Sequence, residues 1–122
     1  MYEDFVSFET AVKFKKKGLN IPFYFFYRTD DKCIHHAPVT NPLEYSDKID
    51  DEVVIAPTIS QVLKWLRDEK AISIEPCATP YNCWFYMIKC KGEIKVTYTG
   101  NKYKTYEAAA IAGIEYVPHY LM

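Results

Sequence analysis

Glycine is scarce in this chain, and its scarcity excludes one class of ligand site. Only four glycines occur among the 122 residues. They are Gly18, Gly92, Gly100 and Gly113, at positions that suit turns and helix ends. A phosphate-binding loop needs glycines close together, so that backbone N–H groups can surround the anion. The sequence therefore predicts no Gly-rich nucleotide site.

An excess of charge of one sign is also lacking. Fifteen Lys and Arg residues oppose sixteen Asp and Glu residues, for a net charge of −1. The chain as a whole is therefore not expected to attract nucleic acid or anionic lipid. No run approaches the roughly 18 apolar residues of a membrane span. The acidic start Met1-Tyr2-Glu3-Asp4 lacks the apolar region of a secretory signal, so we expect a cytoplasmic protein.

The paired cysteine spacings of metal sites are missing as well. The four cysteines are expected to be free thiols in a reducing compartment, and packing is their default role. A zinc site in the Cys33-Ile34-His35-His36 cluster would need a distant cysteine as a further ligand. A thiol nucleophile, from Cys33 or Cys83 with His35, would need a third group that orients the histidine. The sequence shows neither, so we predict no metal, no cofactor and no enzymatic activity. A thiol or metal enzyme is the third hypothesis.

Three helix starts of the same kind are present. Each places a hydroxyl residue before an apolar one, with Glu or Gln in the first turn, as helix caps do. These residues are Ser7, Thr58 and Thr105. The predicted helices cover residues 7–17, 59–70 and 106–117. Gly18 and Leu19 suit a Schellman ending of the first helix, and Pro118 is expected to stop the third.

Segments rich in aromatic and β-branched residues separate these helices and predict strands. The predicted strands cover residues 21–28, 32–37, 71–77, 82–90 and 93–99, with a further short strand conceivable at 53–55. Residues 38–57 otherwise form a predicted surface loop, rich in proline and acidic residues. Lys91-Gly92 predicts a tight turn, and Gly100-Asn101 a break in the sheet. We predict one α+β domain over residues 1–122, with three helices on an antiparallel sheet of about five strands, in the order α-ββ-α-βββ-α.

Two predicted strands are apolar on both faces, because side chains alternate along a strand. In the first, Phe23, Phe25 and Tyr27 face one way, and Tyr24, Phe26 and Arg28 face the other. In the second, one face carries Trp84, Tyr86, Ile88 and Cys90, and the other face carries Cys83, Phe85, Met87 and Lys89. The chain's own helices, the loop over residues 38–57 or a second copy of the chain could cover the additional apolar face. We favour a homodimer, a protein-interaction module with Tyr24, Phe26, Trp84 and Tyr86 at the interface.

Single-stranded nucleic-acid binding is the alternative hypothesis. Lys13, Lys16 and Lys17, together with Lys15, form a basic patch, and exposed tyrosines can stack on bases. The slightly acidic chain and the lack of an RNP-like aromatic motif disfavour this function.

Three short stretches resemble a family of small uncharacterised proteins that gut anaerobic bacteria, their phages and mobile elements carry. Ala56-Pro57-Thr58 followed by Val62-Leu63-Lys64-Trp65-Leu66-Arg67 resembles the family's "AP-T… KWLRE" segment. Thr105-Tyr106-Glu107-Ala108-Ala109, followed by Ala112-Gly113, resembles its "Y-x-T-Y-E-E-A-L-E-A-G" ending, and Phe8-Glu9-Thr10-Ala11 its opening. The resemblance implies an accessory protein of a phage or mobile element, without an assigned activity. The chain departs from the family at Pro118, where relatives continue the helix.

Overall fold

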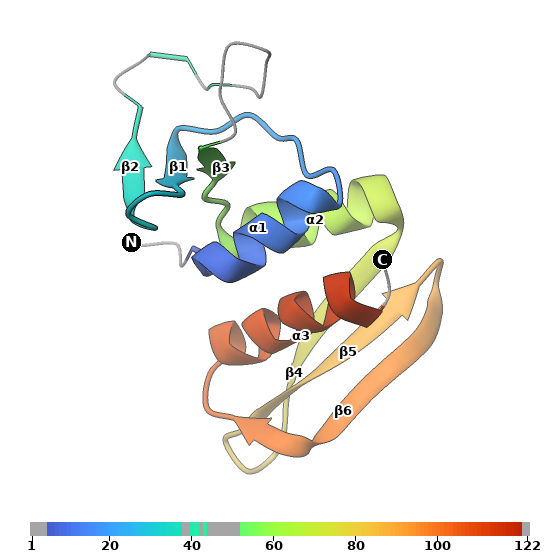
Figure 1. Ribbon diagram of the computed structural model, residues 1–122. Coiled ribbons are helices and arrows are strands. Elements are labelled where there is room, and N and C mark those ends of the chain that lie inside the picture. Colours follow the sequence, from blue (N-terminus) through green and yellow to red (C-terminus); the bar gives the residue numbers. More distant parts are fainter. Residues whose placement is uncertain (1–4, 38–39, 42, 44–51, 121–122) are drawn as a thin grey trace. The chain divides into compact units, whose positions relative to one another are not determined.

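The computed structural model divides the chain into two compact units (Figure 1). It describes residues 5–37, 40–41, 43 and 52–120, except for the side chains of residues 98–102 and 119–120. The N-terminal unit spans Phe5–Thr58, and the C-terminal unit comprises the described residues from Ile59 onward. Most of the predicted acidic loop lies outside the described residues.

The N-terminal unit consists of one helix and a three-stranded antiparallel sheet. Its elements are α1 (Phe8–Lys16), β1 (Phe25–Arg28), β2 (Ile34–His36) and β3 (Val53–Ile55). The strand order is β2-β1-β3. In the register, Phe26 lies between His35 of β2 and Ile55 of β3. The short strand conceivable at residues 53–55 is therefore real, and it completes this sheet.

The capping predicted for the first helix is confirmed at both ends. The Ser7 hydroxyl accepts a hydrogen bond from the Thr10 N–H at 3.3 Å. At the other end, Gly18 takes a φ of +92°, and the Leu19 N–H reaches the Phe14 carbonyl at 3.0 Å. This bond closes a Schellman ending. Local sequence alone therefore defines both ends of α1.

A buried tyrosine joins the chain before α1 to the sheet. The Tyr27 hydroxyl donates a hydrogen bond to the Val6 carbonyl at 2.6 Å, and its ring meets Phe8 edge-on with centroids 5.6 Å apart. Burial raises the pKa of the Tyr27 phenol, and nearby Glu9 adds to this effect. The hydroxyl therefore stays protonated, as the hydrogen bond to a carbonyl requires.

The C-terminal unit consists of two helices and a second three-stranded antiparallel sheet. Its elements are α2 (Ile59–Lys70), β4 (Ile72–Ala78), β5 (Trp84–Cys90), β6 (Glu93–Tyr103) and α3 (Tyr106–Tyr120). The strand order is β4-β5-β6. The predicted turn between β5 and β6 is confirmed, because Lys91 and Gly92 both take positive φ angles, 53° and 84°. The Thr105 hydroxyl caps α3 by accepting from the Ala108 N–H at 3.0 Å.

Helix α3 packs closely against one face of this sheet (Figure 1). The small residues Ala109 and Ala110 are fully buried. At Gly113, a Cβ atom would lie 2.6 Å from Ile74 Cγ2 and 3.4 Å from the Tyr86 ring. The missing side chain therefore allows the helix to approach β4 and β5.

Strand β1 begins at Phe25, whereas the sequence predicted a start at residue 21. Two predicted element ends are also wrong. Helix α3 continues through Pro118 to Tyr120. Pro118 lacks the N–H that would bond the Ile114 carbonyl, but only two helical residues follow it, so the helix loses little beyond that bond. Strand β6 continues through Gly100-Asn101 to Tyr103. Tyr98 of β6 lies opposite Tyr86 of β5. Tyr103, five residues later on β6, lies opposite Trp84, which is only two residues away on β5. The extra β6 residues are therefore absorbed as a bulge instead of ending the strand.

The α+β class, the three helices and the antiparallel strands are confirmed, in the order α-βββ-α-βββ-α. The structure differs from the predicted arrangement in having six strands, which form two sheets instead of one. The two apolar strands of the sequence, β1 and β5, are the central strands of separate sheets. The single domain predicted for residues 1–122 stays a prediction. None of the described helices has the length and apolar character needed to span a membrane.

Candidate interaction surfaces

The four predicted interface residues are divided between the two units. Tyr24 and Phe26 belong to the N-terminal sheet region, whereas Trp84 and Tyr86 lie on β5 in the C-terminal unit. They therefore belong to two candidate surfaces, which are considered separately.

In the N-terminal unit, exposed apolar side chains gather around β1 and β2. Tyr24 is 38% exposed, Phe25 38% and Ile34 41%. The His36 ring stacks on Tyr24 at a centroid distance of 6.4 Å and lies 4.8 Å from Phe25. Tyr24 is thus on the surface, and its role at an interface stays a prediction. Phe26 is only partly exposed, because it stacks on His35 and meets Phe23 edge-on.

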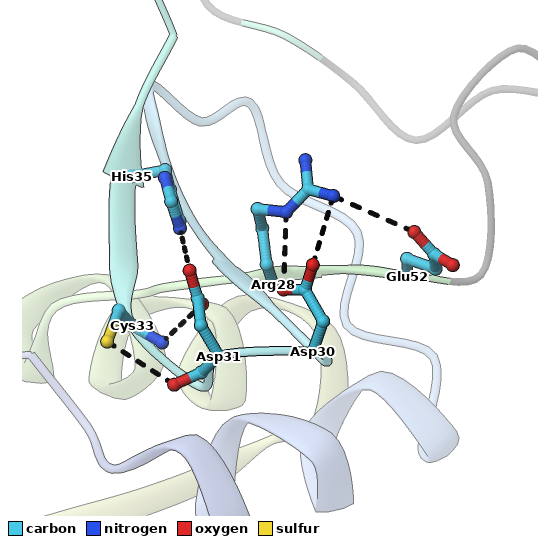
Figure 2. A network of polar contacts seen from close by, with 6 residues as sticks. All are labelled: Arg28, Asp30, Asp31, Cys33, His35 and Glu52. Atoms are coloured by element: carbon cyan, nitrogen blue, oxygen red, sulfur yellow. Dashed lines mark hydrogen bonds and ion pairs between the residues drawn. The ribbon is translucent and has the colours of Figure 1, made fainter.

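A network of polar contacts orders the turn between β1 and β2 (Figure 2). Arg28 donates two hydrogen bonds of 3.3 Å to the Asp30 carboxylate, and its guanidinium lies 3.8 Å from Glu52. These contacts raise the pKa of Arg28, with the hydrogen bond to Asp30 as the main cause. The pairs are exposed to solvent, so each contributes little to stability. Their effect is to define the conformation of the turn.

Asp31 connects the predicted Cys33 and His35 pair. Its carboxylate accepts a hydrogen bond from the Cys33 N–H at 2.9 Å and lies 2.8 Å from His35 Nε2 (Figure 2). Asp31 is thus a group that orients the histidine, which sequence reasoning missed. The Cys33 thiol, however, donates to the Asp31 backbone carbonyl at 3.3 Å. The thiol proton is therefore directed at a carbonyl, which cannot act as a catalytic base at neutral pH.

The Cys33 N–H and then His35 stabilise the ionised Asp31 carboxyl and hold its pKa below the usual value of 3.8. Because the pKa of Asp31 is lowered on folding, its ionised carboxylate stabilises the folded protein above pH 3.8. This contribution is lost as the pH falls through the folded-state pKa. Carbon-detected NMR of the labelled carboxyl measures the midpoint. Since the backbone bond is the main cause, His35→Ala should leave the midpoint below 3.8. A midpoint at or above that value in the wild type would contradict the network.

The predicted lysine patch is only partly available to a ligand. Lys13, Lys16 and Lys17 are exposed on α1 and at its C-terminal cap. The Lys15 ammonium group instead donates a hydrogen bond to the Val53 carbonyl of β3 at 2.8 Å. Lys15 thus helps to hold α1 against the sheet. Among the described residues, no group of three or more His, Cys, Asp and Glu side chains is placed to hold a metal ion.

In the C-terminal unit, the predicted interface residues lie on the face that α3 covers. Tyr86 is only 4% exposed, and its ring approaches Gly113 and lies near Tyr116. Trp84, on the same face, meets Tyr106 edge-on with centroids 5.6 Å apart. Tyr86 therefore belongs to the core of its unit and not to an accessible surface. The sequence pattern identified two apolar faces but could not indicate which one the helix occupies.

The opposite face of β4–β6 carries no helix of its own unit among the described residues. Helix α2 contacts α3, so it lies on the side of the sheet that α3 occupies. Side chains alternate along a strand, and directly paired residues share a face. Among the residues with described side chains, the open face, as we call it, therefore consists of Ser73, Glu75, Cys77, Phe85, Met87, Lys89, Ile94 and Thr97. Ile94 is 60% exposed, and Phe85, Met87 and Cys77 are partly exposed.

Phe85 and Met87, which are partly exposed on the open face, are not among the interface residues that the sequence predicted. They were recognised as one face of an apolar strand, but the aromatic partners on the other face were taken as the interface. The alanine-rich start of α3 and Gly113 mark a helix that packs tightly, yet nothing local indicates the face it covers. No protein-family model, curated protein or solved structure matches this chain. The resemblance to proteins of phages and mobile elements stays a prediction.

Proposed function

We propose that this protein is a non-enzymatic protein-interaction module that self-associates through the open face of its C-terminal sheet. The proposal is supported by the difference between the two faces of the C-terminal sheet, because α3 covers one face and the other is partly exposed. Helix α3 buries Tyr86 and Ile88 on one side, at 4% and 0% exposure. Phe85 and Met87, which alternate with them along β5, remain partly exposed on the other side. Apolar side chains grouped on a surface are typical of protein interaction sites.

The size of the open face indicates a weak association. Three strands about 4.8 Å apart and seven residues long at about 3.3 Å each give roughly 300 Å² of projected area. Stable complexes commonly bury about 800 Å² per partner, so this interface is at the small end. We therefore expect a dissociation constant in the micromolar range, and a concentration-dependent equilibrium between monomer and dimer.

Sedimentation equilibrium from about 10 to about 500 µM tests the proposal, since this range spans the affinity expected of a small interface. The wild type should pass from monomer toward dimer. Met87→Glu should weaken the dimer at least tenfold, because it places a carboxylate in the apolar part of the face.

Tyr81→Ser provides the matched control. Tyr81 is 76% exposed in the loop between β4 and β5, outside the open face, so this change should leave the association unaltered. A wild type that remains monomeric throughout the concentration range would overturn the proposed function.

A further inference from the structure

The two edges of the C-terminal sheet are poor sites for pairing with another strand. On the edge strand β4, Pro76 has no N–H group to donate to a neighbour. On the other edge, β6 shifts register twice relative to β5, and the exposed Lys95 lies at one of these irregularities. Proline, bulges and lysine all hinder edge-to-edge pairing. A protein that binds this sheet is therefore expected to contact the open face and not an edge strand.

The charges on the open face suit a second copy of the same chain. Lys89 Nζ lies 3.3 Å from Glu75 Oε1, and their side chains are 34% and 43% exposed. Among the residues of the open face whose side chains the structure describes, these are the one cation and the one anion. A polyanion gains nothing from such a balanced surface. A second copy brings the same two charges, and each can lie next to its opposite across a two-fold axis.

The register of the sheet indicates where that axis passes. Glu75 is opposite Met87, which is two residues from Lys89 along β5. Glu75 and Lys89 are therefore diagonal neighbours, about 4.8 Å apart across the strands and about 6.6 Å along them, and Met87 adjoins both. Suppose that two sheets stack face to face and a two-fold axis between them sets Glu75 of each copy against Lys89 of the other. That axis then runs close to Met87.

The same axis brings the apolar side chains together. This axis brings Met87 of one copy against Met87 of the other. Ile94 is opposite Lys89 in the register of each chain, so Phe85 of one copy comes near Ile94 of the other. The strands of the two sheets then cross steeply, as in the orthogonal mode of sheet packing. One operation thus pairs both charges and covers Ile94, which is 60% exposed in the single chain.

We infer that two copies of this chain stack open face to open face, about a two-fold axis near Met87, with Glu75 of each copy against Lys89 of the other. The inference rests on the proposed self-association and specifies its geometry. The ion pair within each chain then becomes part of a four-charge cluster across the interface.

Charge reversal on separate chains tests this geometry by sedimentation equilibrium. Glu75→Lys alone leaves two cations per face, so its dimer would gather four, and its self-association should weaken at least tenfold. Lys89→Glu alone should weaken self-association equally, because its dimer would gather four anions. An equimolar mixture should regain wild-type association, since each lysine at position 75 or 89 meets a glutamate across the axis.

A second pair of variants separates this effect from net charge. Glu93 and Lys95 form a 3.3 Å ion pair on β6, and Glu93 is opposite Cys90, on the side of the sheet that α3 covers. Glu93→Lys changes the net charge from −1 to +1, and Lys95→Glu from −1 to −3, as the test pair does. Each control variant should self-associate as the wild type does. Circular dichroism checks that all four variants are folded.

The possible failures are distinguishable. If the wild type dimerises but Glu75→Lys and Lys89→Glu dimerise equally well, or their mixture regains nothing, this geometry is overturned and self-association stands. If the wild type stays monomeric at about 500 µM, beyond the range expected for a small interface, both proposals are overturned. Slow oxidation of Met87 by dilute peroxide in such a monomer would then indicate that the chain itself covers the face.

Discussion

Replacing Phe14 by alanine is expected to lower the free energy of unfolding by about 3–5 kcal/mol, the usual cost of removing a buried phenylalanine ring. Phe14 is 0% exposed, and its carbonyl accepts the Leu19 N–H that closes α1. Urea denaturation followed by circular dichroism measures the change. Phe25→Ala is the matched control. Because Phe25 is 38% exposed, it should cost less than about 1 kcal/mol.

The same variant tests whether residues 1–122 unfold as the single domain that the sequence predicts. Phe14 lies in the N-terminal unit, whereas both tryptophans, Trp65 and Trp84, lie in the C-terminal unit. In a single cooperative domain, tryptophan fluorescence and circular dichroism follow one transition. We expect Phe14→Ala to move both signals to the same lower urea concentration. An unchanged fluorescence transition would contradict the single domain and show that the two units unfold separately.

Replacing Gly113 by alanine is expected to destabilise the C-terminal unit, although alanine normally favours a helix by about 1 kcal/mol over glycine. The new Cβ atom would lie 2.6 Å from Ile74 Cγ2, a branch attached directly to the Ile74 Cβ atom. Ile74 is 6% exposed and Tyr86 4%, so neither has room to move aside. Overpacking of this kind costs about 1–3 kcal/mol. After the helix gain of about 1 kcal/mol is subtracted, the net loss should reach about 2 kcal/mol.

A second substitution checks the cause of that loss. Leucine in place of Ile74 keeps the side-chain volume but lacks the branch that meets the new Cβ atom. The double variant Gly113→Ala with Ile74→Leu should therefore be more stable than Gly113→Ala alone. Urea denaturation of the wild type, both single variants and the double variant provides the coupling energy. A coupling energy of zero would show that the contact between Gly113 and Ile74 is not the reason.

Much of the local structure could be predicted because its causes lie within a few residues. The Ser7 and Thr105 hydroxyls cap their helices through an N–H three residues away. The positive φ angles of Gly18 and Gly92 follow from glycine's freedom in a tight ending or turn. The wrong boundaries, at Pro118 and at Gly100-Asn101, arise where packing or pairing overrides a local signal. There, helix and strand continue past residues that usually end them.

The candidate site also combines features that the local sequence predicts with features that depend on contacts in the folded chain. Sequence reasoning placed Cys33 and His35 together but missed Asp31, which holds both through hydrogen bonds of 2.8–2.9 Å. An aspartate in a polar turn carries no signal of its own, since turns favour such residues for many reasons. Tyr24 and Tyr86 were both predicted at the interface, yet Tyr24 is 38% exposed and Tyr86 only 4%. Both are aromatic residues of apolar segments, so only their neighbours in space distinguish them.

By itself, the sequence determined the α+β class, the three helices with the caps of α1 and α3, the antiparallel strands and the two-sided apolar character of β1 and β5. These properties follow from side-chain alternation and short-range hydrogen bonding. Only the tertiary structure decided that six strands divide into two sheets, and that α3 covers Tyr86 and leaves Phe85 and Met87 open. The reason is physical: both faces of β5 are apolar enough to receive a helix. The choice depends on contacts such as Gly113 against Ile74, which join residues far apart in the chain.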